Sequence, residues 1–376
     1  ALLTLSVVTT PEGRVVSKTT ALGRTTTHEV NYPAEGGRRL ADMQADASRF
    51  EMNIGVDGAR TSISPDGTAV TVLQGPDPRF GMQAPVDALR IIQTPSGLTK
   101  VTSIERSVNL SDPKNLLSLL SWTQLQSING RIFSKSFDAP SNTMSTTSPE
   151  GRTIVSQLGE LGRITRKQYS DFAPIDYEYD QRNRVTQISQ GSGPNARMLS
   201  ITYDSKGYTQ STTDALARTV SFEHDAAGRI VRQVLPDSRE IIFGYDNDGH
   251  MNSITPPGRP AHTYTHNRYG QIVEYRPPDL GPGSESTSYT YDRDLLLVRV
   301  DRPDGSTISY DYDEAGRIRE KIMPHGSVTY TYDPSSGLPA AVTAPDGGLL
   351  TFSYDGSLAT GMSWSGSVAG TVTRQF

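Results

Sequence analysis

The sequence predicts an all-β protein built from β-hairpins that repeat about every 21 residues. Three observations support this fold class: a recurring Tyr-Asp phrase, alternation of apolar and polar residues before it, and turn sequences at both ends of the alternating runs. The spacing is too short for helical repeat modules, which need roughly 33 to 47 residues. The phrase begins at Tyr179, Tyr203, Tyr245, Tyr291, Tyr312, Tyr332 and Tyr354, and His224 and His266 fill the two gaps.

The residues before each phrase have the pattern of a β-strand. In "ISYDYD", Ile308, Tyr310 and Tyr312 alternate with Ser and Asp, and the same alternation precedes the other phrases. A period of two places the three apolar or aromatic side chains on one face of a strand, whereas a helix would scatter them. Each phrase therefore predicts the first strand of a hairpin.

The phrase runs directly into a turn. Residues 225–228 and 313–316 read Asp-x-x-Gly and are followed by Arg and an aliphatic residue. Asp favours the first position of a type I turn, and Gly accommodates the left-handed conformation that reverses the chain. A second alternating strand such as "RIREKIM" follows, and then a Pro-centred turn. Such turns lie at residues 236–237, 303–305, 324–326 and 345–347.

Because these residues recur at equivalent positions, we assign them a structural role in the hairpins. Like side chains of neighbouring hairpins should stack in ladders. The repeat-defining residues are Tyr179, Asp180, Tyr203, Asp204, His224, Asp225, Gly228, Arg229, Tyr245, Asp246, Tyr291, Asp292, Tyr312, Asp313, Gly316, Arg317, Tyr332, Asp333, Tyr354 and Asp355.

The chain is expected to form one continuous domain with two parts. Residues 1–169 read as an irregular β segment and residues 170–376 as the regular array, where fifteen of the 17 tyrosines lie. Residues 9–30 and 147–169 match each other, so the first part also has internal similarity. Asp112 and Pro113 favour at most one short helical turn. The absence of an initiator Met and the end partway through a repeat suggest a fragment of a longer protein.

A sheet this wide is expected to curl. The nine hairpins supply 18 strands and the first part roughly ten more, and open sheets beyond about ten strands usually twist round, split or close. One roll of roughly 28 strands would enclose a hollow about 40 Å across. The competing geometry is a β-propeller with two repeats per blade, favoured by the alternation of His224 and His266 with Tyr245 and Tyr291. That alternation stops after Tyr291, which favours the hollow shell.

Composition excludes several classes of function. The net charge of -5 and the absence of a long basic run argue against a nucleic-acid partner. No run of about 18 apolar residues exists, so membrane insertion is not expected. With no cysteine, disulfides, zinc-thiolate sites and Cys nucleophiles are excluded, which fits a bacterial protein.

No catalytic, cofactor or metal site is predicted. The row of aspartates occupies equivalent turns, whereas a glycosidase needs two carboxylates in different environments. His224, His262 and His266 should lie too far apart to share a metal ion, and His250 and His325 fall in turns. "DNDGH" at residues 246–250 resembles the start of a calcium loop, but the twelfth position holds Pro257 instead of Glu. Each of these motifs reads as part of the repeat.

These motifs resemble the YD-repeat family, also called Rhs repeats. Residues 310–318 match its phrase Tyr-x-Tyr-Asp-x-x-Gly-Arg-hydrophobic, and nearly the whole chain carries related units. The resemblance implies a spiral of hairpins forming a hollow shell, as in the Tc-toxin cocoon, Rhs effectors and the teneurin YD shell. In toxin members the shell surrounds a variable C-terminal toxin. The autoproteolytic aspartate site of those members is not reproduced at residues 332–338.

The sequence therefore suggests a non-enzymatic shell segment of a secreted or surface bacterial protein, which encloses a polypeptide cargo from the same parent chain and needs no cofactor. The alternative is a teneurin-like adhesion or carbohydrate-binding module with a glycan or cell-surface partner, since aromatic ladders interleaved with Arg suit sugars or extended peptides. Alternation alone does not decide which sheet face lines the interior.

Overall fold

The prediction of an all-β fold is confirmed by a computed structural model, which describes residues 3–191, 193, 196–279, 281 and 286–376. The described residues form 33 strands that belong to one sheet. Consecutive strands pair antiparallel, as β1 with β2 and β27 with β28 do. Their helical structure is limited to the 3₁₀ turn η1 (Glu160–Gly162). None of the described residues form a helix long and apolar enough to cross a membrane.

Fourteen strands precede the regular repeats, more than the roughly ten expected. Their bounds are β1 (Thr4–Thr10), β2 (Gly13–Thr19), β3 (Thr25–Asn31), β4 (Arg38–Met43), β5 (Arg49–Ile54), β6 (Arg60–Ile63), β7 (Ala69–Asp77), β8 (Gly81–Gln93), β9 (Thr99–Leu110), β10 (Leu119–Ile128), β11 (Arg131–Asp138), β12 (Thr143–Thr147), β13 (Thr153–Leu158) and β14 (Ile164–Tyr169).

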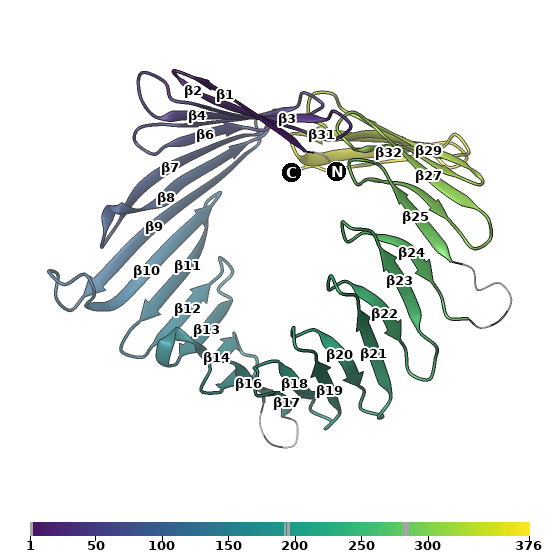
Figure 1. Ribbon diagram of the computed structural model, residues 1–376. Coiled ribbons are helices and arrows are strands. Elements are labelled where there is room, and N and C mark those ends of the chain that lie inside the picture. Colours follow the sequence, from purple (N-terminus) through teal and green to yellow (C-terminus); the bar gives the residue numbers. More distant parts are fainter. Residues whose placement is uncertain (1–2, 192, 194–195, 280, 282–285) are drawn as a thin grey trace. The chain divides into compact units, whose positions relative to one another are not determined.

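The nine predicted hairpins occur as β15 to β32, followed by one further strand. Figure 1 shows them as consecutive hairpins, from teal β16 to yellow β31. Their bounds are β15 (Ile175–Tyr179), β16 (Val185–Gln190), β17 (Arg197–Tyr203), β18 (Thr209–Thr213), β19 (Thr219–His224), β20 (Ile230–Val234), β21 (Glu240–Tyr245), β22 (Met251–Thr255), β23 (His262–His266), β24 (Ile272–Arg276), β25 (Thr287–Tyr291), β26 (Leu297–Asp301), β27 (Thr307–Tyr312), β28 (Ile318–Met323), β29 (Gly326–Tyr332), β30 (Pro339–Thr343), β31 (Leu349–Asp355), β32 (Leu358–Ser365) and β33 (Gly370–Thr373).

The chain divides into two compact units. The first unit comprises Ala1–Ile104, Ser127–Gly130 and Ser288–Phe376, and the second unit comprises Glu105–Gln126 and Arg131–Thr287. The first unit thus joins the earliest strands to the last repeats, which are far apart in sequence. The expected boundary near residue 170 describes where the repeats become regular, and it stays a prediction.

The turn after each Tyr-Asp phrase has the expected geometry. The N–H of Asp225 donates to the carbonyl of Arg229 at 2.9 Å, and the N–H of Gly228 donates to the carbonyl of Asp225 at 3.2 Å. Gly228 has φ +83°, the left-handed conformation that favours glycine. The register shifts between Glu223 and His224, so the hairpin combines a type I turn with a bulge. The Asp313 turn repeats both backbone hydrogen bonds.

The Pro-centred turns fall into two kinds. At residues 344–348 the N–H of Ala344 donates to the carbonyl of Gly348, and the turns at 235–239 and 302–306 are built in the same way. The turn at Pro324 is shorter, because Met323 pairs directly with Gly326. Gly326, with φ +123°, therefore begins β29 instead of ending a longer loop.

The residues that favoured at most one helical turn form a loop between β9 and β10. The N–H of Asn115 donates to the carbonyl of Asp112 at 3.0 Å, and the N–H of Lys114 donates to Oδ1 of Asp112 at 2.9 Å. The Asp side chain therefore closes a tight turn.

The sheet of the repeats has two chemically different faces. Phe243 lies opposite Ile254, which lies opposite His262, so one face carries apolar and aromatic rows. The other face carries polar rows, such as Glu223 opposite Arg232. Among the described residues the hydrophobic side chains classed as buried are Ala41 and Ile308. The accessible surface is 23397 Å², against about 15,000 Å² for a compact protein of 40.9 kDa. The sheet is a single layer.

Candidate functional site

A contact that recurs between neighbouring repeats is the main feature of the array. The guanidinium of Arg229 donates from Nε to Oδ2 of Asp225 at 2.7 Å, and its Cζ lies 4.5 Å from the ring centre of Tyr245 in the next repeat. The local carboxylate thus orients the cation over the following aromatic ring. The same stack joins Arg163 to Tyr179, Arg184 to Tyr203 and Arg317 to Tyr332.

The tyrosine hydroxyl adds a second bond to the same neighbour. The hydroxyl of Tyr245 donates to the carbonyl of Ile230 at 2.9 Å, the residue directly after Arg229. A Tyr of one repeat is therefore held by both the side chain and the backbone of the previous repeat. Equivalent bonds run from Tyr179 to Ile164, Tyr203 to Val185, Tyr312 to Leu297 and Tyr332 to Ile318.

The turn glycine has a role that its positive φ does not explain. A Cβ added to Gly228 would lie 2.5 Å from the ring of Tyr208, the residue that follows the turn glycine of the previous repeat. A Cβ on Gly337 would similarly lie 3.1 Å from Nη1 of Arg317. The glycine therefore leaves room for the stacking residue of its neighbour. We call the Arg stack, the Tyr hydrogen bond and this glycine contact the interlock.

The turn carboxylates of Asp180 and Asp225 accept several hydrogen bonds. Oδ1 of Asp225 accepts the N–H groups of Ala227 at 2.9 Å and Arg229 at 3.0 Å. The backbone N–H of Arg229, and then its side chain, hold the pKa of Asp225 below its usual value. The backbone and side chain of Arg184 lower the pKa of Asp180 in the same way. These carboxylates are unsuited to act as proton donors near neutral pH.

In the first unit, turns from opposite ends of the chain meet at their tips. Oδ2 of Asp294 accepts the hydroxyl of Thr20 at 2.6 Å and Nη1 of Arg24 at 2.5 Å, and Oδ1 accepts the N–H of Leu22 at 3.0 Å. The Asp294 side chain is only 5% exposed. Burial opposes its ionisation, but the bonds from Thr20, Leu22 and Arg24 outweigh burial and lower the pKa.

Two further contacts continue this arrangement. Nη1 of Arg317 lies 2.7 Å from Oδ2 of Asp46. Ser96 donates to Asp355 from its N–H at 2.8 Å and from its hydroxyl at 2.5 Å. We call the contacts at Asp294, Arg317 and Asp355 the seam. In Figure 1 the purple and yellow strands of this unit lie next to one another. The seam joins residues 259 to 274 positions apart in the sequence.

The repeat-defining residues of the sequence analysis include Arg229 and Tyr245 but not Arg163, Arg184 or Tyr208, and the sequence did not reveal how these residues pair. The tyrosines were expected to stack on each other, whereas in several repeats the side chain directly after the turn lies against the ring of the next repeat, as Arg229 and Arg317 do. In two repeats that side chain is aromatic or His, so Tyr208 stacks on His224 and His250 stacks on His266, both at 5.1 Å between ring centres. The seam was missed, although the match between residues 9–30 and 147–169 placed Arg24 and Arg163 at equivalent positions.

The histidines considered as metal ligands have separate surroundings. His224 stacks on Tyr208, and Nδ1 of His262 lies 2.8 Å from the hydroxyl of Tyr275. His250, which was set aside because it follows a turn, lies against His266 together with Asp246. Within "DNDGH" the N–H of Asp246 donates to the carbonyl of His250 at 2.9 Å, so the segment forms the turn of its repeat.

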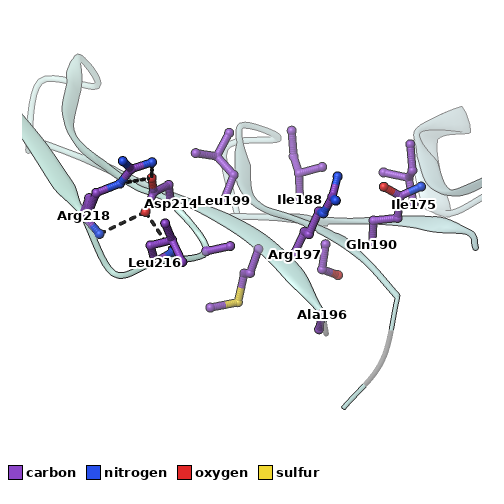
Figure 2. Close-up of a pocket in the computed structure, with 12 residues that line it drawn as sticks. Ile175, Ile188, Gln190, Ala196, Arg197, Leu199, Asp214, Leu216 and Arg218 are labelled. Atoms are coloured by element: carbon purple, nitrogen blue, oxygen red, sulfur yellow. Dashed lines mark hydrogen bonds and ion pairs between the residues drawn. The ribbon is translucent and has the colours of Figure 1, made fainter. Parts of the chain in front are cut away.

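A depression of about 550 Å³ lies beside β16 and β17 in the second unit. Ile188 and Leu199, paired across β16 and β17, form its floor. Figure 2 shows these two side chains on the same side of the sheet and the Asp214–Arg218 pair at one end. Leu216, at the tip of that turn, is 72% exposed. Apolar surface of this kind suits an extended or partly unfolded polypeptide.

The geometry defines a class of protein: a structural shell module made of one layer of interlocked hairpins. The family described as Teneurin YD-shell matches residues 14–376, and the chain belongs to this family. The resemblance seen in the sequence is thereby confirmed.

Two kinds of relative accompany the family match. A protein named double-stranded DNA deaminase toxin A, from Burkholderia cenocepacia (strain H111), is 24% identical over 249 residues, which cover 56% of this chain and 17% of the relative. The solved structure TcdB2-TccC3-TEV matches with a TM-score of 0.51 at 12% identity, covering 99% of this chain and 26% of that chain. TcdB2-TccC3 matches with a TM-score of 0.43 at 13% identity, covering 96% and 27%. The chain spans about a quarter or less of these proteins, and the match to TcdB2-TccC3-TEV shows similarity of fold.

Proposed function

We propose that this chain is a wall segment of a secreted or surface-delivered bacterial shell that encloses a polypeptide cargo, such as a toxin, from the same parent chain. The observation that carries the proposal is the apolar face of a single-layered sheet. Rows such as Phe243, Ile254 and His262 have no second layer of described residues over them. A cargo held against such a face would cover apolar surface that water otherwise contacts.

The interlock supports a role as a barrier. Neighbouring repeats are joined by backbone pairing, and several are also joined by an Arg stack or a Tyr hydrogen bond, as at Arg229 and Tyr245. Paired strands leave no free backbone groups on which another chain could add or a protease could act. The name of the deaminase toxin relative supports a toxin as the cargo class.

We propose that the wall itself is not an enzyme. The carboxylates of the repeats lie in equivalent turns and are occupied by local N–H groups and Arg side chains, as at Asp180 and Asp225. Their lowered pKa values oppose general acid catalysis.

The test is limited proteolysis of the full-length parent protein, with mass spectrometry of the fragments. A C-terminal polypeptide that survives until the shell is denatured is the expected result. Asp294→Asn, which weakens the seam, should increase cleavage of the cargo, whereas Asp176→Asn, at an exposed ion pair, should not. A cargo that is cleaved in the native wild type at the same rate as after denaturation would refute encapsulation.

A cluster of three rings favours a second candidate, an adhesion or carbohydrate-binding role. The ring centres of Tyr264 and Tyr275 are 5.4 Å apart, and those of His262 and Tyr275 are 5.9 Å apart. Stacked aromatic faces on an uncovered sheet suit sugars. Saturable glycan binding by this chain, lost in Tyr264→Ala, would favour this candidate, and its absence together with a protected cargo would favour the shell.

A further inference from the structure

Three potential metal ligands from two neighbouring repeats converge in the second unit. Nδ1 of His250 lies 3.5 Å from Oδ2 of Asp246, and Nδ1 of His266 lies 3.7 Å from the same oxygen. All three ligand atoms lie within 4.8 Å of one another. Asp246 and His250 belong to one turn, while His266 ends the first strand of the next repeat.

Both imidazoles present an unsatisfied nitrogen to this space. Nδ1 of His250 and Nδ1 of His266 are buried and make no hydrogen bond with any described residue. The His266 side chain is only 9% exposed. Buried polar atoms without a partner are costly and uncommon, so two of them facing one carboxylate indicate a missing ligand.

The neighbouring repeat shows what these histidines replace. At the positions of His250 and His266 it has Arg229 and Tyr245, whose polar groups are occupied by Asp225 and by the carbonyl of Ile230. With histidine at both positions, the Arg–carboxylate bond and the Tyr hydroxyl bond are absent. The rings of His250 and His266 keep the stack between the two repeats, but the hydrogen bonds made by Arg229 and Tyr245 have no counterpart here. The contacts of the repeat therefore do not explain why both positions hold histidine.

The carboxylate is already oriented. Oδ1 of Asp246 accepts the N–H groups of Asp248 at 3.0 Å and His250 at 2.9 Å, so Oδ2 is left to face the imidazoles. Such fixed outer contacts are typical of carboxylates that bind metals.

We propose that Asp246, His250 and His266 bind a divalent first-row transition metal, with zinc as the best fit. Nitrogen and carboxylate oxygen are zinc ligands, and in a tetrahedral site with bonds of about 2.0 to 2.1 Å they lie roughly 3.3 Å apart. The distances of 3.5 and 3.7 Å are close to this value. Water completes the fourth position, as in zinc sites with three protein ligands.

Binding requires a small rearrangement that can be detected. The two rings are stacked with 27° between their planes. Each ring must turn for both nitrogens to reach one ion, and the stack is then broken. The ion would fasten two consecutive repeats at the place where the usual Arg and Tyr bonds are absent.

The test is a titration of this chain, stripped of metal with a chelator, with Co²⁺ as a coloured substitute for zinc. We expect one equivalent of Co²⁺ to give the visible absorption of a tetrahedral site, and Zn²⁺ to displace it. Imidazole ¹⁵N spectra should show coordination at Nδ1 of two histidines. If the wild type binds no metal stoichiometrically, or if these nitrogens only take up protons, the proposal fails.

The repeat supplies its own control variant. His250→Arg combined with His266→Tyr restores the pair found at Arg229 and Tyr245, so the fold should be retained while the site is lost. This double variant should lose the Co²⁺ absorption and the zinc-dependent rise in melting temperature. His325→Gln and His262→Gln should leave both unchanged. Unchanged metal binding in the double variant, or its loss in the His325 variant, would overturn the assignment.

Discussion

Arg229 and Arg24 occupy equivalent positions, directly after a turn glycine, yet they make different contacts. Arg229 remains with its own turn and lies over Tyr245 of the next repeat. Arg24 instead reaches Asp294, 270 residues away. Arg317 does both, since it bonds Asp313, lies over Tyr332 and contacts Asp46. The same motif thus builds local contacts in the array and long-range contacts at the seam.

The interlock and the seam differ in how far apart in the sequence their contacting residues lie. An interlock joins residues about 15 to 20 positions apart, so each added repeat forms its contacts with little loss of chain entropy. The seam needs a complementary turn from a distant segment. Asp294 provides a carboxylate at the position where the Asp225 and Asp313 turns have Ala227 and Ala315. Local contacts should form early and the seam late.

Asp294→Asn should have the largest effect, because it removes the charge that pairs with Arg24. The Arg24 side chain is only 16% exposed, so its cation would be left poorly solvated. We expect a loss of about 2 to 4 kcal/mol in unfolding free energy, measured by urea denaturation, with faster amide exchange at Leu22. Asp176→Asn, at a pair with 43% and 55% exposed side chains, should cost less than about 1 kcal/mol. Equal losses would contradict a special role for the seam.

Gly228→Ala compared with Gly305→Ala separates the two roles of the turn glycine. Both residues have positive φ, but a Cβ on Gly228 would meet the Tyr208 ring at 2.5 Å, whereas Gly305 has nothing within 4 Å. Each variant should lose about 1 kcal/mol from backbone strain. Gly228→Ala should lose about 1 to 2 kcal/mol more from overpacking, measured by thermal unfolding. The interlock would be refuted at this contact if the two variants were equally stable.

Tyr245→Phe tests the hydroxyl alone. The ring can keep its place under Arg229, but the carbonyl of Ile230 loses its donor. We expect a loss of about 1 kcal/mol in chemical denaturation. Tyr169→Phe, at a ring that is 38% exposed, should change stability by less than about 0.5 kcal/mol. No difference between these variants would show that the hydroxyl bond contributes nothing to stability.

Asp225→Asn should have the smallest effect, which is present near neutral pH and disappears in acid. The folded pKa of Asp225 is lowered by Arg229. Its contribution is therefore present above the ordinary Asp pKa of about 4 and is lost as the pH falls through the lower folded value. The variant should show a slightly flatter decline of melting temperature between about pH 4 and pH 2. A steeper decline than in the wild type would reverse the assigned sign.

The sequence allowed the hairpins, their turns and their number to be predicted, because period-two alternation and Asp-x-x-Gly are local signals. It did not reveal the interlock, since the residue that stacks on each Tyr belongs to the previous repeat. Asp294 gave no signal at all, because its partners Thr20 and Arg24 are distant in the chain. The metal-ligand cluster was missed because His250 was treated as a turn residue, without considering that post-turn side chains stack on the next repeat.

The space left by each turn glycine gives the array a direction. In several repeats the side chain after one turn glycine lies over the glycine of the following repeat, as Tyr208 does at Gly228, so these hairpins have a donor side and an acceptor side. A duplicated hairpin that is inserted between two whole repeats carries both the turn glycine and the side chain that follows it. It can therefore form the same contacts with the repeats on either side. An insertion inside a repeat instead separates the turn glycine from the side chain that should lie over it. Proteins of this design can therefore change length by whole repeats during evolution.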